Sequence, residues 1–220
     1  MPTVDEPVEV RDVAPGLWLW RQRNWEWKDG DDWEPKVSSF VVTSGGETIL
    51  LDPLAPPPIA GAEIYRRLDA TRPTRIVVLK PDHVRDVALF AHWYDVPVHG
   101  PWLFWGGEAP RVDIQPILPD QVLPGGLVAL VDDRGGIERP LYLPEQKAIV
   151  FADGMTAPGG VLRVWWTPVL ERRVLPALRA MLELPFERVL VSHGEPVHTR
   201  ADFEAALERE PWSIPEGESA

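Results

Sequence analysis

Aspartate and histidine residues follow four apolar segments of this chain, each at the point where a strand would end. The segments are residues 48–51, 75–79, 148–151 and 188–191, and the polar residues that follow them are Asp52, His83, Asp153 and His193. The ends of strands are where α/β proteins build their active sites. Imidazoles and carboxylates that meet there bind divalent metals and act as general acids and bases. The pattern therefore predicts one cleft that gathers these side chains.

The remaining sequence predicts the elements that position this cleft. Runs of apolar residues predict further strands, and apolar residues at helical spacing predict four helices. We expect strands over 37–43, 48–52, 75–80, 96–99 and 188–191, with a second sheet formed by strands around 112–116, 127–131, 139–143 and 148–151. The expected helices cover 59–70, 84–94, 170–184 and 200–210. We expect residues 1–210 to form a single domain and residues 211–220 a frayed tail.

Composition narrows the classes of partner and site. The chain has 220 residues, 45% hydrophobic and 25% charged, which is ordinary for one globular domain. Its net charge of -12 argues against nucleic acid and anionic membrane surfaces. The absence of cysteine excludes disulfides, thiolate metal sites and cysteine nucleophiles. Since neither a signal peptide nor an apolar run of about 18 residues is present, we expect a cytoplasmic protein.

The order of several short motifs resembles the metallo-β-lactamase fold, the superfamily of glyoxalase II, lactonases and class B lactamases. The resemblance runs from about Gly16 to about Ala206. It rests on residues 14–18, 50–52, 141–147, 151–154 and 191–194. It implies the fold class α/β, a four-layer αββα sandwich with two mixed β-sheets and helices outside. It also implies descent from hydrolases.

The resemblance further implies a metal-binding signature, Thr-His-x-His-x-Asp-His, which this chain does not keep. Aligning Leu79-Lys80 with the Leu-Thr of the family places Pro81 on the first histidine and His83 on the second. Arg85 then takes the place of the aspartate and Asp86 that of the last histidine. A shifted alignment matches Asp82-His83 to the Asp-His pair instead. Both alignments lose at least two metal ligands.

The rest of the implied metal centre is partly kept. Asp153 matches the bridging aspartate and His193 the last histidine, while Arg134 falls where the third histidine would be. Asp52 matches a residue that supports the site from behind. The remaining ligands would be His83, Asp86, Asp153 and His193, which could hold one Zn²⁺, Fe²⁺ or Mn²⁺ ion but not two.

Positive residues beside the predicted site argue against any metal. Arg85 replaces a carboxylate, Arg134 replaces an imidazole, and Lys80 lies next to the same turn. Such cations repel a divalent ion and can pair with the carboxylates instead. We therefore expect no cofactor, with a single divalent metal as the alternative, and we assign charge compensation to Arg85 and Arg134.

Tryptophan supplies the other unusual feature, because the chain contains 11. Tryptophans commonly anchor cores and interfaces. We expect the same here, with an aromatic pocket wall or a dimer surface as the alternative, because several of them lie in segments that the family uses around its site. We assign substrate contacts to Trp27, Trp105 and Trp165.

Three hypotheses of function follow. The first is a metallo-β-lactamase-fold protein with a degenerate, metal-free site that binds an unidentified small molecule or has a non-catalytic role. The second is a single-metal hydrolase of an ester, lactone or thioester, with Asp82 or Asp86 as the base. The third is a homo-oligomeric scaffold that buries its Trp-rich loops.

Overall fold

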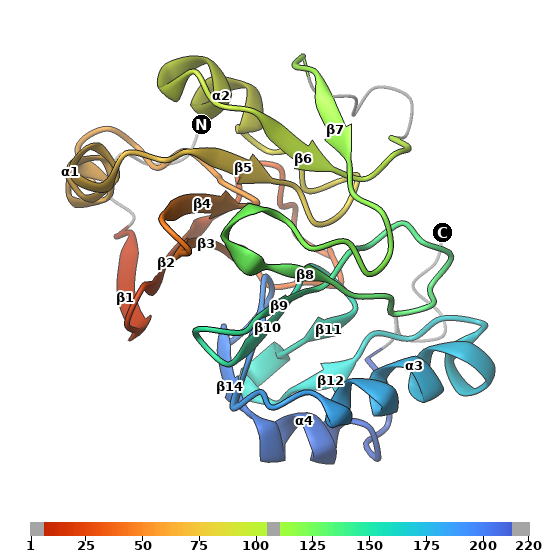
Figure 1. Ribbon diagram of the computed structural model, residues 1–220. Coiled ribbons are helices and arrows are strands. Elements are labelled where there is room, and N and C mark those ends of the chain that lie inside the picture. Colours follow the sequence, from red (N-terminus) through yellow and green to blue (C-terminus); the bar gives the residue numbers. More distant parts are fainter. Residues whose placement is uncertain (1–6, 105–110, 213–220) are drawn as a thin grey trace.

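Two β-sheets stack face to face in the computed structural model, with helices on the outer faces (Figure 1). The structure describes residues 7–104 and 111–212. This is the αββα sandwich that we expected. Within those residues, no helix has the length and apolar content that crossing a bilayer requires.

Within residues 7–104 and 111–212, the first sheet has seven strands that pair in the order of the sequence. The first four pair antiparallel and the last three add in parallel, so the sheet is mixed. The strands are β1 (Glu9–Ala14), β2 (Leu17–Arg23), β3 (Lys36–Ser44), β4 (Glu47–Leu51), β5 (Arg75–Val77), β6 (Val98–Gly100) and β7 (Ile114–Pro116). We had placed the last of these strands in the second sheet, which was wrong, because it pairs with β6.

The second sheet, in the part of the chain that the structure describes, has five strands in the order β14-β13-β10-β9-β8. Its only parallel pair is β10 with β13 among the strands that the structure describes, and these two central strands carry the site residues. The strands are β8 (Val128–Ala129), β9 (Leu141–Leu143), β10 (Ala148–Phe151), β13 (Arg188–Val191) and β14 (Val197–Thr199). A small separate hairpin pairs β11 (Met155–Thr156) with β12 (Arg163–Val164).

The α-helices of the described residues cover the sheets (Figure 1). They are α1 (Ala62–Thr71), α2 (Val87–Tyr94), α3 (Leu175–Ala180) and α4 (Arg200–Ala206). A π-helical segment, Leu170–Val174, precedes α3, and a 3-10 turn, Met181–Glu183, follows it. The continuous helix that we expected over 170–184 is thus three short segments. Pro176 lacks a backbone N–H and disfavours a continuous α-helix there.

Successive side chains of each strand point to opposite faces of its sheet, and this divides the interior into three apolar layers. In β2, Leu17 and Leu19 face the other sheet, whereas Trp18 and Trp20 face α1 and α2. In β10, Val150 faces the first sheet and Phe151 packs towards α3 and α4. Successive side chains of a strand point to opposite faces, so strands covered on both sides are apolar throughout. These continuous apolar runs end at one edge of the sandwich, where the polar residues begin.

Residue 212 departs from the frayed tail that we expected. The Trp212 indole donates to the backbone carbonyl of Asp32 at 2.8 Å, and its amide donates to Val164 at 2.8 Å. It also pairs with Trp165 as an isolated β-bridge. The chain is therefore anchored at least to this residue, and the remaining tail lies outside the described residues.

Candidate functional site

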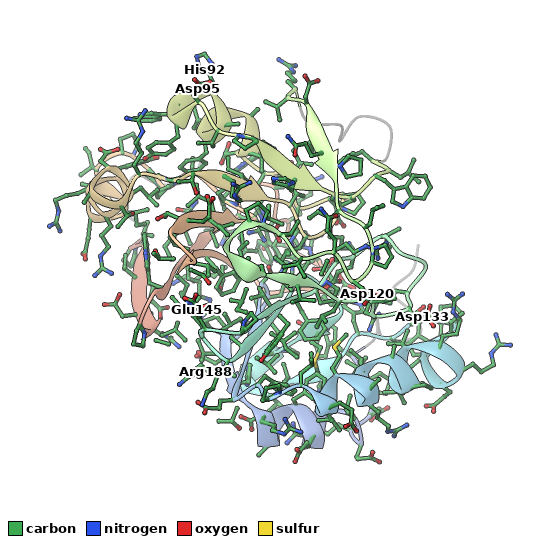
Figure 2. The ribbon with its side chains drawn as sticks, in the orientation of Figure 1. His92, Asp95, Asp120, Asp133, Glu145 and Arg188 are labelled. Carbon is green, nitrogen blue, oxygen red and sulfur yellow. The ribbon has the colours of Figure 1, made fainter. Side chains whose placement is uncertain are left out.

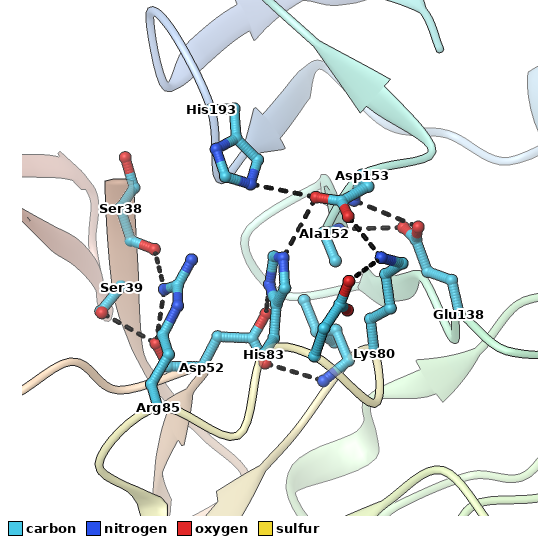
Figure 3. Close-up of polar contacts among 12 residues, drawn as sticks. Ser38, Ser39, Asp52, Lys80, His83, Arg85, Glu138, Ala152, Asp153 and His193 are labelled. Atoms are coloured by element: carbon cyan, nitrogen blue, oxygen red, sulfur yellow. Dashed lines mark hydrogen bonds and ion pairs between the residues drawn. The ribbon is translucent and has the colours of Figure 1, made fainter. Parts of the chain in front are cut away.

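The site lies where strands of both sheets end. Asp52 directly follows β4, and Lys80 and His83 lie in the turn after β5. Asp153 follows β10 and His193 follows β13 in the second sheet. Figure 3 shows the side chains of His83, Lys80 and His193 converging on Asp153. The two histidine rings pack edge to face, with ring centres 5.6 Å apart.

Asp52 shapes the turn that carries His83. It is fully buried, and one carboxylate oxygen accepts a hydrogen bond from the Leu79 amide at 2.8 Å. The other oxygen accepts one from His83 Nδ1 at 2.8 Å. Its backbone has a φ of 44°, a left-handed conformation that non-glycine residues adopt at some energetic cost. Asp52 thus holds one ring nitrogen of His83, and the other ring nitrogen contacts Asp153.

Asp153 is the centre of the polar network. One oxygen accepts from His83 Nε2 at 3.1 Å and from His193 Nε2 at 3.0 Å. The other lies 2.6 Å from Nζ of Lys80. Burial disfavours the charged carboxylate, but the positive charges of His83 and Lys80 outweigh it and hold the pKa of Asp153 well below its usual range. Asp153 is therefore an anion enclosed by donors.

The two histidines have opposite charge preferences. Burial disfavours a charged imidazole, but the carboxylates of Asp153 and Asp52 at its two nitrogens raise the pKa of His83 to about 9. Burial lowers the pKa of His193, which has only Asp153 as a carboxylate partner among the described residues. At neutral pH the arrangement therefore favours a charged His83 and a neutral His193 that donates through Nε2.

Lys80 supplies the cation that neutralises Asp153. Its ammonium also pairs with the Asp82 carboxylate, and its side chain is 13% exposed. Burial lowers the pKa of Lys80, but the charges of Asp153 and Asp82 outweigh it, and the net shift is upward. We assigned charge compensation to Arg85 and Arg134, yet the ion pairs of Asp153 among the described residues come from Lys80 and the two histidines.

The two arginines bind elsewhere in the site. Arg85 donates to the backbone carbonyls of Ser38 and Asp52, both at 2.8 Å, because its left-handed backbone (φ 45°) turns the side chain towards β3. Arg134 lies 3.1 Å from the Asp132 carboxylate and donates to the Gly154 carbonyl at 2.8 Å. Arg134 therefore compensates a different buried carboxylate.

Glu138 is a site residue that we did not predict. It is fully buried and accepts hydrogen bonds from three consecutive amides, those of Ala152, Asp153 and Gly154, at 2.7–3.1 Å. Burial and the negative charges of Asp132 and Asp153 raise the pKa of Glu138 to about 8. Glu138 holds the turn that presents Asp153. Residues 135–140 contain two glycines and a proline, so the sequence indicates only a loop there.

The two predicted bases are separated in the structure. Asp82 borders the site cavity and pairs with Lys80. Asp86 is not among the described residues that line the cavity, and its carboxylate accepts a hydrogen bond from the Ala55 amide at 2.7 Å. It immediately precedes α2. The structure thus does not bring Asp86 to His83, Asp153 and His193.

A cavity of about 540 Å³ opens above the network. Tryptophans 33, 165 and 166 line it, together with the acidic residues Glu26 and Asp32. Of the three substrate contacts that we predicted, Trp165 lines the cavity. Trp27 does not line it within the described residues but donates to the Trp33 carbonyl at 2.7 Å, and Trp105 lies outside the described residues. Other polar side chains point outwards around the molecule, as His92 and Arg188 do in Figure 2.

No protein-family model and no curated protein matches the sequence. Solved structures match it over most of its length. A metallo-beta-lactamase from Pontibacter korlensis is similar with a TM-score of 0.66 and 16% identity, covering 92% of this chain and 100% of the other. The chain has the metallo-β-lactamase fold.

Two further structures of this fold extend the comparison. The metallo-beta-lactamase FIM-1 from Pseudomonas aeruginosa, solved in a mono-zinc form, is similar with a TM-score of 0.64 and 16% identity, covering 94% of this chain and 96% of the other. A metallo-beta-lactamase family protein from Thermus thermophilus gives a TM-score of 0.62 at 15% identity, covering 88% of this chain and 77% of the other. At such identities the likeness establishes the fold alone, and the chemistry must be argued from the residues of this chain.

The metallo-β-lactamase fold implies zinc, and the residues here fit it only in part. Ligand atoms of His83, Asp153 and His193 lie within 4.8 Å of one another. His83 has the supporting carboxylate behind it that metal-binding histidines usually have. His193 does not, because its buried Nδ1 has no hydrogen-bond partner among the described residues. Lys80 holds the second oxygen of Asp153. The donor set thus offers three ligand atoms close together, one of them on a carboxylate that also pairs with Lys80.

Proposed function

We propose that this chain is a metal-independent member of the metallo-β-lactamase fold that binds a small molecule, with the ammonium group of Lys80 in place of a divalent cation. The observation that carries the proposal is the 2.6 Å contact between Lys80 Nζ and Asp153. Asp153 aligns with the bridging aspartate of the family. A lysine that pairs with this carboxylate satisfies its charge without a metal.

The charge balance of the site supports the same proposal. Three cations face three anions in and beside the network: Lys80, His83 and Arg85 against Asp52, Asp82 and Asp153. A divalent ion bound at Asp153 would add two positive charges beside the cations that already contact this carboxylate, Lys80 and His83. Coulomb repulsion at a few ångströms inside a protein amounts to several kcal/mol. Metal binding would therefore require Lys80 to move away and His83 to lose its proton.

The cavity supports a binding role. A volume of about 540 Å³ is within the range of small-molecule sites, and the lining combines aromatic rings with a few polar groups. Metal-dependent hydrolysis in such a pocket uses the metal to lower the pKa of bound water. None of the network residues replaces that effect, because Lys80 is held protonated and Asp153 is held ionised by their partners.

Metal analysis tests the proposal directly. Protein purified without chelator is dialysed against zinc chloride, washed through a desalting column and measured by plasma mass spectrometry. We expect well under one equivalent of zinc. Two equivalents that survive the column would contradict the proposal. The exposed pair of Lys147 and Glu187 offers a matched control, since Lys147→Ala removes a lysine ion pair away from the site.

A second candidate is the single-metal hydrolase, favoured by the convergence of His83, Asp153 and His193 within 4.8 Å. Asp82 borders the cavity and would be the base in that case. This function requires one equivalent of zinc, iron or manganese in the same measurement. It also requires turnover of an ester, lactone or thioester that appears on metal addition and disappears in His193→Ala.

A further inference from the structure

The mouth of the site cavity is built from tryptophans of two distant segments. Trp33 comes from the loop between β2 and β3, and Trp165 and Trp166 follow β12. The rings of Trp33 and Trp165 both contact His193 edge to face, with ring centres 5.0 Å and 6.2 Å from the imidazole. The tryptophan rings therefore flank the cavity between solvent and the polar network, which forms the floor of the cavity.

Hydrogen bonds hold these walls in place before any ligand binds. The Trp27 indole donates to the Trp33 carbonyl at 2.7 Å, and the Trp212 indole donates to the Asp32 carbonyl at 2.8 Å. The Trp166 amide donates to the Trp212 carbonyl at 2.7 Å, so one residue connects both walls. A pocket organised in advance loses less entropy when it binds.

Acidic side chains lie at the mouth beside the tryptophans. Glu26 and Asp32 line the cavity, and neither forms an ion pair within the part of the chain that the structure describes. The cations of the cavity are engaged deeper in the site: Lys80 with Asp153, Arg85 with two carbonyls and Arg134 with Asp132. Burial, with a further contribution from the charge of Asp153, raises the pKa of Asp32. A half-buried carboxylate in this position is stabilised by a positive ligand.

We propose that the cavity mouth binds an organic cation, a ligand with a substituted ammonium group that lies against the tryptophan rings and beside Asp32 and Glu26. This inference rests on the proposed function, because it names the ligand class of the same cavity. Tryptophan faces attract cations most strongly when the cation is poorly hydrated, as alkylated ammonium groups are. A strongly hydrated inorganic ion gains little from such rings, and an anion is repelled by the two carboxylates.

Calorimetric titration with choline chloride tests the inference on the full chain. The matched probe is 3,3-dimethyl-1-butanol, which has the same shape without the charge. We expect choline to bind one site with a Kd of about 1 mM or tighter, and the neutral probe to bind about tenfold or more weakly. Equal affinity for the two probes, or no choline binding, would overturn the inference. If sodium occupied the site as effectively as choline does, the site would belong to an inorganic ion, and the inference would be overturned as well.

Variants locate the binding at the mouth. Asp32→Asn and Trp33→Leu should each weaken choline binding by about tenfold, whereas Asp29→Asn should leave it within about twofold. Asp29 is an exposed acid of the same loop, so its variant loses the same charge outside the cavity. If Asp29→Asn and Asp32→Asn weakened choline binding equally, the effect would come from net charge alone, and the inference would be overturned.

Zinc content measured on the same samples separates this inference from the proposed function. If the protein contains no zinc and does not bind choline, only the proposed ligand class is overturned. A zinc-loaded protein overturns the proposed function, whatever its affinity for choline.

Discussion

Carboxylates at the floor of the cavity have charged or hydrogen-bonding partners, whereas those at its mouth form no ion pair among the described residues. On the floor, each carboxylate meets a cation or a row of amides, as Asp153 does with Lys80 and Glu138 with three backbone N–H groups. At the mouth, Asp32 and Glu26 have no ion-pair partner among the described residues. Internal pairing stabilises a fold, whereas unpaired charge beside aromatic rings favours a ligand. The floor should therefore contribute to stability and the mouth to binding.

The largest expected effect is the loss of the central cation. Lys80→Met leaves the partly buried Asp153 carboxylate without its ammonium partner, which should lower the free energy of unfolding by about 3 kcal/mol. The double variant Lys80→Met with Asp153→Asn should recover part of this loss, since it also removes the uncompensated charge. Urea unfolding followed by circular dichroism measures both. A loss no larger than that of Lys147→Met, which breaks an exposed pair, would remove the distinction between floor and mouth.

The turn that carries Asp153 should be the next most sensitive feature. Glu138→Ala leaves the amides of Ala152, Asp153 and Gly154 without their acceptor, and we expect a loss of about 2 kcal/mol. Glu145→Ala is the matched control, because that exposed carboxylate accepts one amide only among the described residues. If the two variants unfolded at the same urea concentration, the three hydrogen bonds of Glu138 would contribute no more to stability than the single one of Glu145.

Stability should also fall on the alkaline side. The folded protein raises the pKa of His83 to about 9 from an unfolded value of about 6.5, so it holds this proton more tightly than the unfolded chain. The contribution of His83 is therefore complete below about pH 6.5 and is lost as the pH rises through about 9. The raised pKa of Glu138 acts in the same direction at lower pH. Melting temperatures measured from pH 6 to pH 10 at constant ionic strength should decline, and His83→Gln should flatten the upper part of the curve.

The mouth should show the smallest effect on stability. Asp32→Asn removes a half-buried carboxylate without an ion-pair partner among the described residues, so its melting temperature should equal or slightly exceed that of the parent protein. Its loss should instead appear in ligand affinity. A clear drop in melting temperature would show that Asp32 is part of the structural network.

Much of the fold was predictable from the sequence, because buried strands give continuous apolar runs whose polar ends mark the site. The four motifs at residues 48–52, 75–83, 148–153 and 188–193 lie at the expected edge. Positions within the turn after β5 were harder to predict. Arg85 follows His83 closely, yet its left-handed backbone directs it to the carbonyls of Ser38 and Asp52.

Side-chain direction also explains the other differences. Lys80 lies at the start of the turn after β5 and still reaches Asp153, because its long side chain crosses between the two sheets. Asp86 is occupied by the Ala55 amide, a contact with no signature in the sequence. Glu138 lies 14 residues or more from the amides it binds, in a loop that periodicity does not describe. Spacing predicts which strand ends meet, whereas the backbone angles of the turns decide which side chains touch.

Zinc titration of the Lys80 variant tests the central claim most directly. Lys80→Met keeps His83, Asp153 and His193 and removes only the ammonium group that we propose to replace the metal. Isothermal calorimetry should detect no stoichiometric zinc binding by the parent protein and a new one-to-one site in Lys80→Met. Tight zinc binding by the parent protein, with no gain in the variant, would contradict the account.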